Sequence, residues 1–296
     1  MMKVRLLIYG LGLNYNNTVN ALHYFEMRGD IEILAVTDKK LPDGSKFDGY
    51  DLITREEAIK IDYNYIVITS DRFFHEIVNE LEEMGIDKEK ILPARIFLLP
   101  NLNFQKYIEL KNSKPTIISN TCWGGIVYRK LGLECRSPFK NLFLRNNEYI
   151  KLINNFEYYM HCELEFTGQT LWEVDLKWDF PIMRLDDVNV YCNHYHTPEE
   201  AKKKWNERRA KINYSNLIAE MGVESREIAE QFLKFSPNIK RKICLVPFKQ
   251  THQDMYHLER RPGQTEFWQT VNASGDNTEY NLVEWLLGNN AARNTM

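Results

Sequence analysis

Short apolar runs alternate with amphipathic segments over the N-terminal third of the chain. Runs of strand length occupy Lys3–Tyr9, Ile31–Thr37 and Tyr65–Thr69. Continuous runs of this kind are typical of strands that are buried on both faces of a parallel sheet. Between them, apolar residues recur at helical spacing over Asn17–Met27 and Asp71–Met84. Strands that alternate with helices predict an α/β domain with a parallel sheet and right-handed crossovers.

A glycine turn follows the first predicted strand. Gly10 and Gly12 separate that strand from the next helix, and Asp38 follows the second strand. In dinucleotide-binding domains, such glycines admit the phosphates and such an acidic residue binds ribose hydroxyls. Tyr15 stands at the third glycine position, so the fingerprint is broken. The block resembles the small Rossmann-like domains found beside bacterial polysaccharide enzymes. A nucleotide or nucleotide-sugar ligand and a docking role both remain open, so the cofactor is left unassigned.

A domain boundary is predicted near Ser113–Pro115, where two polar residues precede a proline. Residues 1–114 are expected to form a Rossmann-like domain with a parallel sheet. Residues 115–296 are expected to form a second, mixed α/β domain that ends in an irregular tail. The predicted fold class is therefore α/β throughout.

The middle of the second domain gives a weaker pattern. Residues 163–180 are aromatic and show no clear period, so we expect irregular structure there. Pro181–Leu185 and Val188–Tyr195 predict two strands that turn at Asp186 and Asp187. We interpret the paired carboxylates as turn residues, and an acid/base or metal role is the alternative.

The segment that begins at Ile117 carries the main candidate site. Ile117 and Ile118 predict a short buried strand, a polar turn follows, and Gly124 and Gly125 open a helix. Backbone N–H groups at a helix start lack intrahelical partners and attract anions, and a thiol there becomes more reactive. We therefore assign the two glycines to substrate binding and Cys122 to catalysis.

Two further side chains of this turn are candidates for substrate binding. Asn120 offers an amide and Trp123 a flat face, which together would orient a polar ring. The alternative is structural: the asparagine caps the helix, the glycines allow close packing, and Cys122 is an ordinary buried thiol.

Two histidines lie on the same face of the strand predicted to begin at Val188. Alternate strand residues point the same way, which places His194 and His196 together. They would form a metal pair, supply a general base, or bond to neighbours at the strand end. We include both in the catalytic set and assign no metal. Ligands in open sheets bind beyond the carboxyl ends of strands, so we predict a pocket between the Asn120–Gly125 turn and these histidines.

Composition excludes several classes of partner. The net charge of −3 gives no electrostatic basis for binding nucleic acid or an anionic membrane. The five cysteines form no Cys-x-x-Cys pair, which argues against a zinc ribbon or a disulfide framework. The sequence contains no apolar run long enough to span a membrane, and we expect no secretory signal, because Met1–Tyr9 predicts a strand. We expect a cytoplasmic protein with a small-molecule or sugar substrate, and the oligomeric state is left open.

Three runs carry a resemblance to a known family. SNTCWGGIVYRKLGL, SPFKNLFL and HYHTPEEAKKKWNERRAKINYSNL resemble the bacterial family called domain of unknown function 1919. Its members often carry the name exopolysaccharide biosynthesis protein. The resemblance covers roughly residues 115–250 and implies an uncharacterised transferase-like enzyme that acts on an activated sugar or precursor in bacterial cell-surface polysaccharide biosynthesis. The alternative is a non-catalytic protein in the same pathway that binds a nucleotide-sugar or acts as a scaffold.

Overall fold

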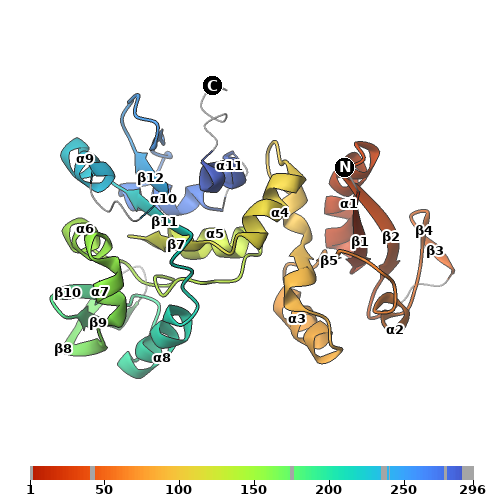
Figure 1. The fold of residues 1–296 in the computed structure, drawn as a ribbon, viewed down its shortest axis with the longest axis horizontal. Coiled ribbons are helices and arrows are strands. Elements are labelled where there is room, and N and C mark those ends of the chain that lie inside the picture. The colour runs from red at the N-terminus through yellow and green to blue at the C-terminus, as the bar shows by residue number, and fades with distance from the viewer. Residues whose placement is uncertain are drawn as a thin grey trace. The chain divides into compact units, whose positions relative to one another are not determined.

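Parallel strands form the two largest sheets of the computed structural model (Figure 1). The structure describes residues 3–40, 44–173, 177–234, 239, 241–276 and 279–288. By its internal contacts the chain divides into two units, residues 1–107 and 108–296. The boundary predicted at residue 114 stays a prediction.

The N-terminal unit contains a four-stranded parallel sheet in the order β2-β1-β5-β6. Its strands are β1 (Val4–Tyr9), β2 (Ile31–Thr37), β5 (Tyr65–Ile68) and β6 (Ile91–Pro93). Its main helices are α1 (Leu13–Met27) and α3 (Phe74–Glu83). The apolar runs form these strands because both faces are covered: Leu6 and Ile8 are completely buried. The predicted parallel α/β arrangement is confirmed for this unit.

Smaller elements complete the N-terminal unit. They are the antiparallel pair β3 (Lys46–Phe47) and β4 (Tyr50–Asp51), helix α2 (Arg55–Ala58), the short 3-10 helices at Lys88–Lys90 and Ala94–Leu98, and α4 (Phe104–Asn112), which crosses the division between units. The loop between β3 and β4 is tied to α1, because the Tyr15 hydroxyl donates to Asp48 over 2.8 Å. Tyr15, the residue that breaks the glycine fingerprint, is therefore a buried anchor for this loop.

The C-terminal unit contains a second parallel sheet in the order β13-β12-β11-β7. Its strands are β7 (Thr116–Ser119), β11 (Leu217–Gly222), β12 (Arg241–Val246) and β13 (Met255–His257). On one face, α5 (Trp123–Leu131) packs on β7 and α10 (Phe267–Ser274) packs on β11 (Figure 1). On the other face lie α6 (Asn146–Asn154) and α9 (Arg226–Lys234), where the Tyr149 hydroxyl donates to the Ile118 carbonyl over 2.9 Å. Helices therefore cover both faces of this parallel sheet.

Along the chain, the segment between β7 and β11 forms a separate antiparallel sheet. It consists of β8 (Leu164–Glu173), β9 (Trp178–Leu185) and β10 (Val188–Tyr191) in the order β10-β9-β8. The predicted hairpin is confirmed, and Asp186 adopts the left-handed conformation at its turn (φ 50°). Two expectations were wrong: Leu164–Glu173 and the start of β9 at Trp178 are strands in place of irregular structure, and β10 ends at Tyr191.

The physical reason for the first error lies in the edge strand β8. Phe166, Leu171 and Trp172 are all exposed on it, so apolar side chains occupy positions where a half-buried strand normally carries polar ones. The C-terminal region also held more order than its weak periodicity suggested, because β13 and α10 lie there. Residues 289–296 of the predicted tail are outside the described part of the chain.

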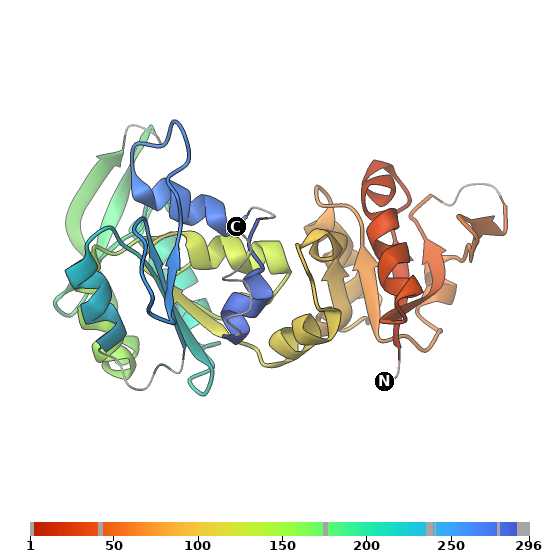
Figure 2. The ribbon, with the colours of Figure 1, turned by 90° about the horizontal axis from the view of Figure 1, so that it is seen from above.

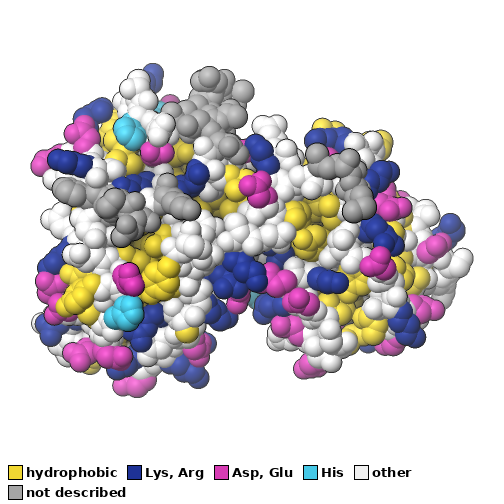
Figure 3. Space-filling model, in the orientation of Figure 1, with side chains coloured by type: hydrophobic (Ala, Val, Ile, Leu, Met, Phe, Trp, Pro, Cys, Tyr) yellow, Lys and Arg dark blue, Asp and Glu magenta, His cyan; other side chains and the backbone are white. Residues whose placement is uncertain are grey.

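The remaining helices of this unit are α7 (Phe156–His161), α8 (Pro198–Arg209) and α11 (Leu282–Leu287). Helix α8 is capped by Thr197, whose hydroxyl accepts the Glu200 backbone N–H. Figure 2 shows the same units from above. Within the described residues, every helix is too short or too polar to cross a membrane. Figure 3 shows acidic and basic side chains interspersed over the visible face of each unit.

Candidate functional site

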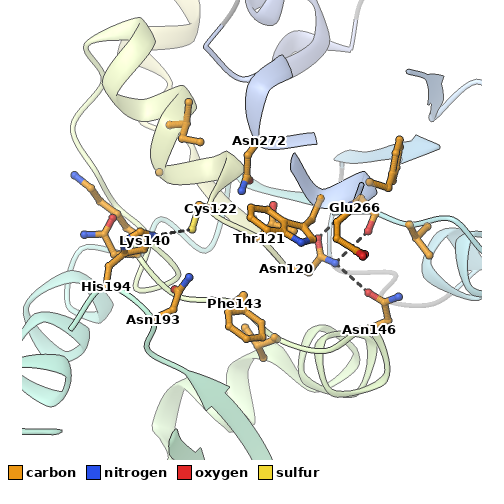
Figure 4. Close-up of a pocket in the computed structure, with 18 of the residues that line it drawn as sticks. Asn120, Thr121, Cys122, Lys140, Phe143, Asn146, Asn193, His194, Glu266 and Asn272 are labelled. Atoms are coloured by element: carbon orange, nitrogen blue, oxygen red, sulfur yellow. Dashed lines mark hydrogen bonds between the residues drawn. The ribbon is translucent and has the colours of Figure 1, made fainter. Parts of the chain in front are cut away.

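A pocket of about 700 Å³ lies beyond the carboxyl ends of β7 and β11 in the C-terminal unit (Figure 4). The lining residues come from the turn at Asn120–Cys122 and the following α5, from the segment between Lys140 and Asn146, from Asn193–His194 after β10, from the end of β11 and the two residues after it (Gly222–Glu224), and from Glu266 and α10. The carboxyl edge of a parallel sheet is where ligands bind in open α/β folds. The pocket size is that of an ordinary small-molecule site.

Cys122 and His194 face each other inside this pocket. The Cys122 Sγ lies 3.4 Å from the His194 Nε2, and Figure 4 shows the two side chains pointing toward one another. Cys122 occupies the N-cap position of α5, where the positive end of the helix dipole favours a thiolate. Desolvation of the ring lowers the pKa of His194 below its usual value although the residue keeps contact with solvent. The imidazole is therefore neutral near pH 7 and can accept a proton.

Asn120 lines the pocket, but its side chain is used within the fold. The Gly222 N–H donates to Asn120 Oδ1 over 3.1 Å, and Asn120 Nδ2 donates to the Gly222 carbonyl over 3.3 Å. A further bond of 3.2 Å joins the same Nδ2 to Asn146 Oδ1. The amide thus extends the pairing of β7 and β11 beyond the last backbone rung. Its predicted role in orienting a ligand ring gives way to a role in holding the turn.

Two other predicted binding residues do not line the pocket. Trp123 is completely buried, and its indole N–H donates to Ser274 Oγ over 3.1 Å. Gly124 provides close packing, since a Cβ there would lie 3.2 Å from Ile117 Cγ2 and from Ser119 Cβ. Helix α5 turns these positions toward the sheet and α10. The predicted ligand contacts of Trp123 and Gly124 are therefore corrected to packing contacts.

Gly125 lines the pocket, and its lack of a side chain leaves space for Lys140. A Cβ at Gly125 would lie 3.0 Å from Lys140 Cγ. The Lys140 backbone is fixed as well, because its carbonyl accepts bonds of 3.1 Å from Tyr195 Oη and from Arg208 Nη1. Lys140 therefore reaches the pocket wall next to the helix start that carries Cys122.

The other charged groups of the pocket are largely held by partners. Arg129 pairs with Asp276 over 3.1 Å, and Glu224 pairs with Arg260. Glu266 caps α10 in a box with Gln269. These partners leave Lys140 as the pocket cation whose ammonium group forms no ion pair among the described residues.

His196 has a different environment from His194. Its ring packs against Trp178 with centroids 5.0 Å apart, and it is not among the pocket residues. The cause is that β10 ends at Tyr191, so strict alternation does not extend to the histidines. Across the described residues, no three His, Cys, Asp or Glu side chains are grouped to hold a metal ion. The structure therefore brings Cys122 and His194 together and places His196 elsewhere.

A buried carboxyl group lies one residue before the turn on the same two strands. Glu220 of β11 is completely buried, and the Ser119 hydroxyl of β7 donates to its Oε2. Its Oε1 has no partner within the described structure. Burial raises the pKa of Glu220 to about 8, so the group is predominantly protonated at pH 7. The contact between Ser119 of β7 and Glu220 of β11 is therefore one between a hydroxyl and a neutral carboxyl group.

The glycine turn of the N-terminal unit is closed by its own carboxylate. The Leu11 N–H donates to Asp38 Oδ2 over 2.7 Å, and the Lys40 N–H donates to Asp38 Oδ1 over 3.1 Å. Gly10 has a φ of +100°, and a Cβ there would lie 2.6 Å from Thr69 Oγ1. Gly12 is the N-cap residue of α1. Asp38 lies at the turn as predicted from its sequence position, but here it binds the turn itself.

Sequence reasoning missed several pocket residues. Lys140, Asn193, Glu266 and Asn272 all line the cavity. Lys140 lies within the run SPFKNLFL, and Asn193 directly precedes His194, which was a usable signal. Glu266 and Asn272 belong to the cap and body of α10, whose sequence gave no clear period, so their contribution depends on the tertiary fold.

Comparisons with known proteins give family-level information. A family model described as Domain of unknown function (DUF1919) matches residues 94–287, which is more than half of the chain. A second model, described as C2185-like, N-terminal, matches residues 2–92. An uncharacterised protein of Haemophilus influenzae is 29% identical over 124 residues, which cover 40% of this chain and 57% of that relative. The match thus spans less than two thirds of the relative's length.

Proposed function

We propose a function for this chain, which belongs to the family described as Domain of unknown function (DUF1919). It is a cytoplasmic group-transfer enzyme that uses Cys122 as nucleophile and His194 as general base. Its substrate is an activated sugar or a related precursor of a cell-surface polysaccharide. The observation that carries the proposal is the 3.4 Å approach of Cys122 Sγ to His194 Nε2 inside the pocket of about 700 Å³.

The transfer proceeds in two steps through a covalent intermediate on Cys122. First, the Cys122 thiol gives its proton to His194 Nε2 while the sulfur attacks the electrophilic carbon of the donor. The leaving group departs with the bonding electron pair and takes the proton from His194. In the second step an acceptor hydroxyl attacks the same carbon and gives its proton to His194. The carbon–sulfur bond breaks with its electron pair on sulfur, and the proton passes from His194 to Cys122, which regenerates the thiol.

Three features of the pocket support this chemistry. The neutral state of His194 lets the ring act as a base, since burial lowers its pKa. The N-terminus of α5 and the positive charge of Lys140 favour an anionic leaving group such as a phosphate. The link to polysaccharide precursors is supported by the family resemblance.

The reactivity of Cys122 tests the dyad directly. Site-resolved alkylation by iodoacetamide, followed by mass spectrometry, compares Cys122 with the partly buried Cys135 and Cys162 in the same protein. We expect Cys122 to react fastest at pH 7 and His194→Gln to slow it by about tenfold or more. The two reference cysteines should keep their rates. Equal rates at all three cysteines, with no effect of His194→Gln, would contradict the proposal.

The substrate class is tested by trapping the intermediate. The protein is incubated with a panel of nucleotide-sugars, quenched in acid and analysed by intact mass. We expect a covalent increment on the parent that is absent from Cys122→Ser. A reactive Cys122 without an increment from any panel member would retain the dyad and overturn the substrate class.

For the N-terminal unit we propose a Rossmann-like domain with a nucleotide site at the turn after β1. The supporting observation is that β1 joins α1 through Gly10 and Gly12, with Asp38 at the same turn. A bound phosphate would replace the Asp38 carboxylate on the Leu11 N–H, and Asp38 would move to ribose hydroxyls. The strand order is β2-β1-β5-β6, so the chain continues to one side of β1 with β2 and to the other side with β5. Ligands in such sheets bind at this change of direction, which here lies between β1 and β5. A rise in melting temperature with nucleotides, lost in Asp38→Ala, would support the site; equal binding by Asp38→Ala would refute it.

A further inference from the structure

Trp268 gives the pocket an exposed aromatic wall. The residue is 42% exposed, and among the large apolar residues exposed in the described part of the chain it is the one that lines the pocket. Helix α10 fixes its position, because Phe267 and Val271 are buried and Val271 packs on Gly222 of β11. Trp268 and Asn272 are four positions apart, and both line the pocket, so they mark the face of α10 that borders it.

An exposed indole in a pocket suits a ligand ring that has an apolar face. Tryptophan offers a large, rigid surface at a low cost in conformational entropy. Sugar rings present an apolar face through their C–H groups, and nucleobases are apolar on both faces. The pocket of about 700 Å³ is in the size range that holds such ligands. The charges beside Trp268 decide between these two kinds of ring.

Positive and negative side chains lie at different ends of the pocket. Figure 4 shows Lys140 and His194 on one side of the Cys122 side chain and Glu266 on the other. Glu266 is exposed and lies two residues before Trp268, at the N-cap of α10. The end of the pocket next to Trp268 is therefore acidic.

A second carboxylate of this end is neutralised. Arg260 pairs with Glu224, which lines the pocket, and donates to the Thr265 carbonyl over 2.7 Å. These contacts join Glu224 to the residue before Glu266. Glu266 itself forms no ion pair among the described residues. Its carboxylate accepts the Gln269 backbone N–H, which uses only part of the acceptor capacity of two oxygens.

A carboxylate beside the indole favours ligand hydroxyl groups and disfavours ligand anions. Hydroxyls at the rim of a sugar ring donate hydrogen bonds to carboxylate oxygens. A carboxylate on the ring would meet the like charge of Glu266. The base of a nucleotide is joined through its ribose to phosphates, which would bring negative charge toward the same end. A neutral sugar ring brings none.

We infer that the pocket binds the sugar unit of its substrate against the indole of Trp268, with ring hydroxyls donating to Glu266, and that it selects uncharged sugars over acidic ones. The inference rests on the proposed function, because it takes the pocket to be the substrate site. It adds the residue that holds the ring and the charge class of the sugar. The test uses binding alone, so that it does not depend on catalysis.

The experiment compares pairs of ligands that differ in one charge. Saturation-transfer NMR titrations of full-length Cys122→Ser protein use the methyl glycosides of glucose, galactose and mannose. Each is paired with its methyl uronide, in which a carboxylate replaces the hydroxymethyl group. At least one neutral glycoside should bind about threefold or more tightly than its uronide, because the added carboxylate lies near an exposed like charge. The preference should shrink at high salt, since salt screens exposed charges.

Side-chain variants assign the two parts of the inference. Trp268→Ala should weaken binding of the preferred glycoside by about tenfold, and Trp268→Phe should lose less because it keeps a ring. Glu266→Gln keeps an acceptor but removes the charge, so the glycoside and its uronide should then bind with similar affinity. Trp172→Ala is the matched control and should bind as the parent does, because Trp172 is 57% exposed on β8 outside the pocket. Circular dichroism of each variant verifies folding.

The outcomes separate this inference from the proposed function. Absence of binding by every neutral glycoside would overturn the inference, as would uronides that bind as tightly, or normal binding by Trp268→Ala. Uridine or adenosine that bound through Trp268 in place of the glycosides would assign the indole to a nucleobase and would also overturn it. None of these results changes the alkylation test of Cys122. Binding of a neutral glycoside that depends on Trp268, combined with an unreactive Cys122, would support the inference and contradict the catalytic dyad.

Discussion

The two units use the same local structure, a buried parallel strand followed by a turn and a helix, in different ways. After β1 the turn contains Gly10 and Gly12, and the backbone N–H of Leu11 is occupied by Asp38 from the next strand end. After β7 the turn carries Cys122 at the helix start, where it faces His194 across a pocket.

The difference comes from the elements that surround each turn. In the N-terminal unit Asp38, the residue after the neighbouring β2, supplies a carboxylate that closes the turn. In the C-terminal unit the inserted antiparallel sheet delivers Asn193 and His194, and α10 delivers Asn272. A strand–turn–helix unit becomes a candidate site when elements outside it present side chains to the turn.

The largest expected effect is on the pH dependence of stability, and it comes from the buried pair Ser119 and Glu220 near the ends of β7 and β11. Glu220 has a folded-state pKa of about 8 against a reference value of 4.5. Between these values the unfolded chain loses the proton while the folded protein keeps it, so this group lowers stability by about 1.4 kcal/mol for each pH unit of increase. The full stability is present below about pH 4.5. Glu220→Gln should remove this dependence and become more stable than the parent by several kcal/mol near pH 8.

Urea unfolding of the parent and Glu220→Gln at several pH values measures this difference. Glu230→Gln on the exposed side of α9 serves as the control for loss of a carboxylate. A stability difference between the parent and Glu220→Gln that stays constant from pH 5 to pH 8 would show that Glu220 does not carry a buried proton.

A second test introduces a steric clash into the turn after β1. Gly10→Ala combines a positive φ with a Cβ only 2.6 Å from Thr69 Oγ1, and should cost about 3 kcal/mol. Gly12→Ala is the matched control, because no heavy atom lies within 4 Å of its Cβ and its φ is −82°. Denaturant midpoints for the two variants should therefore differ clearly. Equal midpoints would mean that the turn after β1 can relax around a methyl group.

The smallest expected effect tests whether Asp38 closes the first turn. Asp38→Ala leaves the Leu11 and Lys40 N–H groups without their carboxylate acceptor, at a cost of about 2 kcal/mol. Asp38→Asn retains one side-chain carbonyl and should lose less. Hydrogen exchange at the Leu11 amide should accelerate in the alanine variant. Unchanged exchange would indicate that another group takes the place of Asp38, and the contrast between the two turns would weaken.

Sequence patterns located the turns better than they assigned side chains within them. The predicted edge between the Asn120 turn and the segment after β10 is where the pocket lies. Trp123 and Asn120, however, are both used by the fold, because helix α5 rotates the indole toward Ser274 and the amide bridges to Gly222. Helical rotation and strand register decide such directions, and neither was fixed by the spacing of residues along the chain.

The sequence by itself determined most of the buried parallel strands, the helices between them and the position of both turns, but not β8, β13 or α10. Local effects are sufficient for this, since apolar runs, glycines and caps act through neighbours in the chain. Only the tertiary structure decided which side chains meet: Cys122 and His194 are 72 positions apart, and Ser119 and Glu220 are 101 apart. Such contacts depend on strand pairing and on the insertion of one sheet within another. These long-range arrangements are set by packing of the whole core and are not encoded in any single segment.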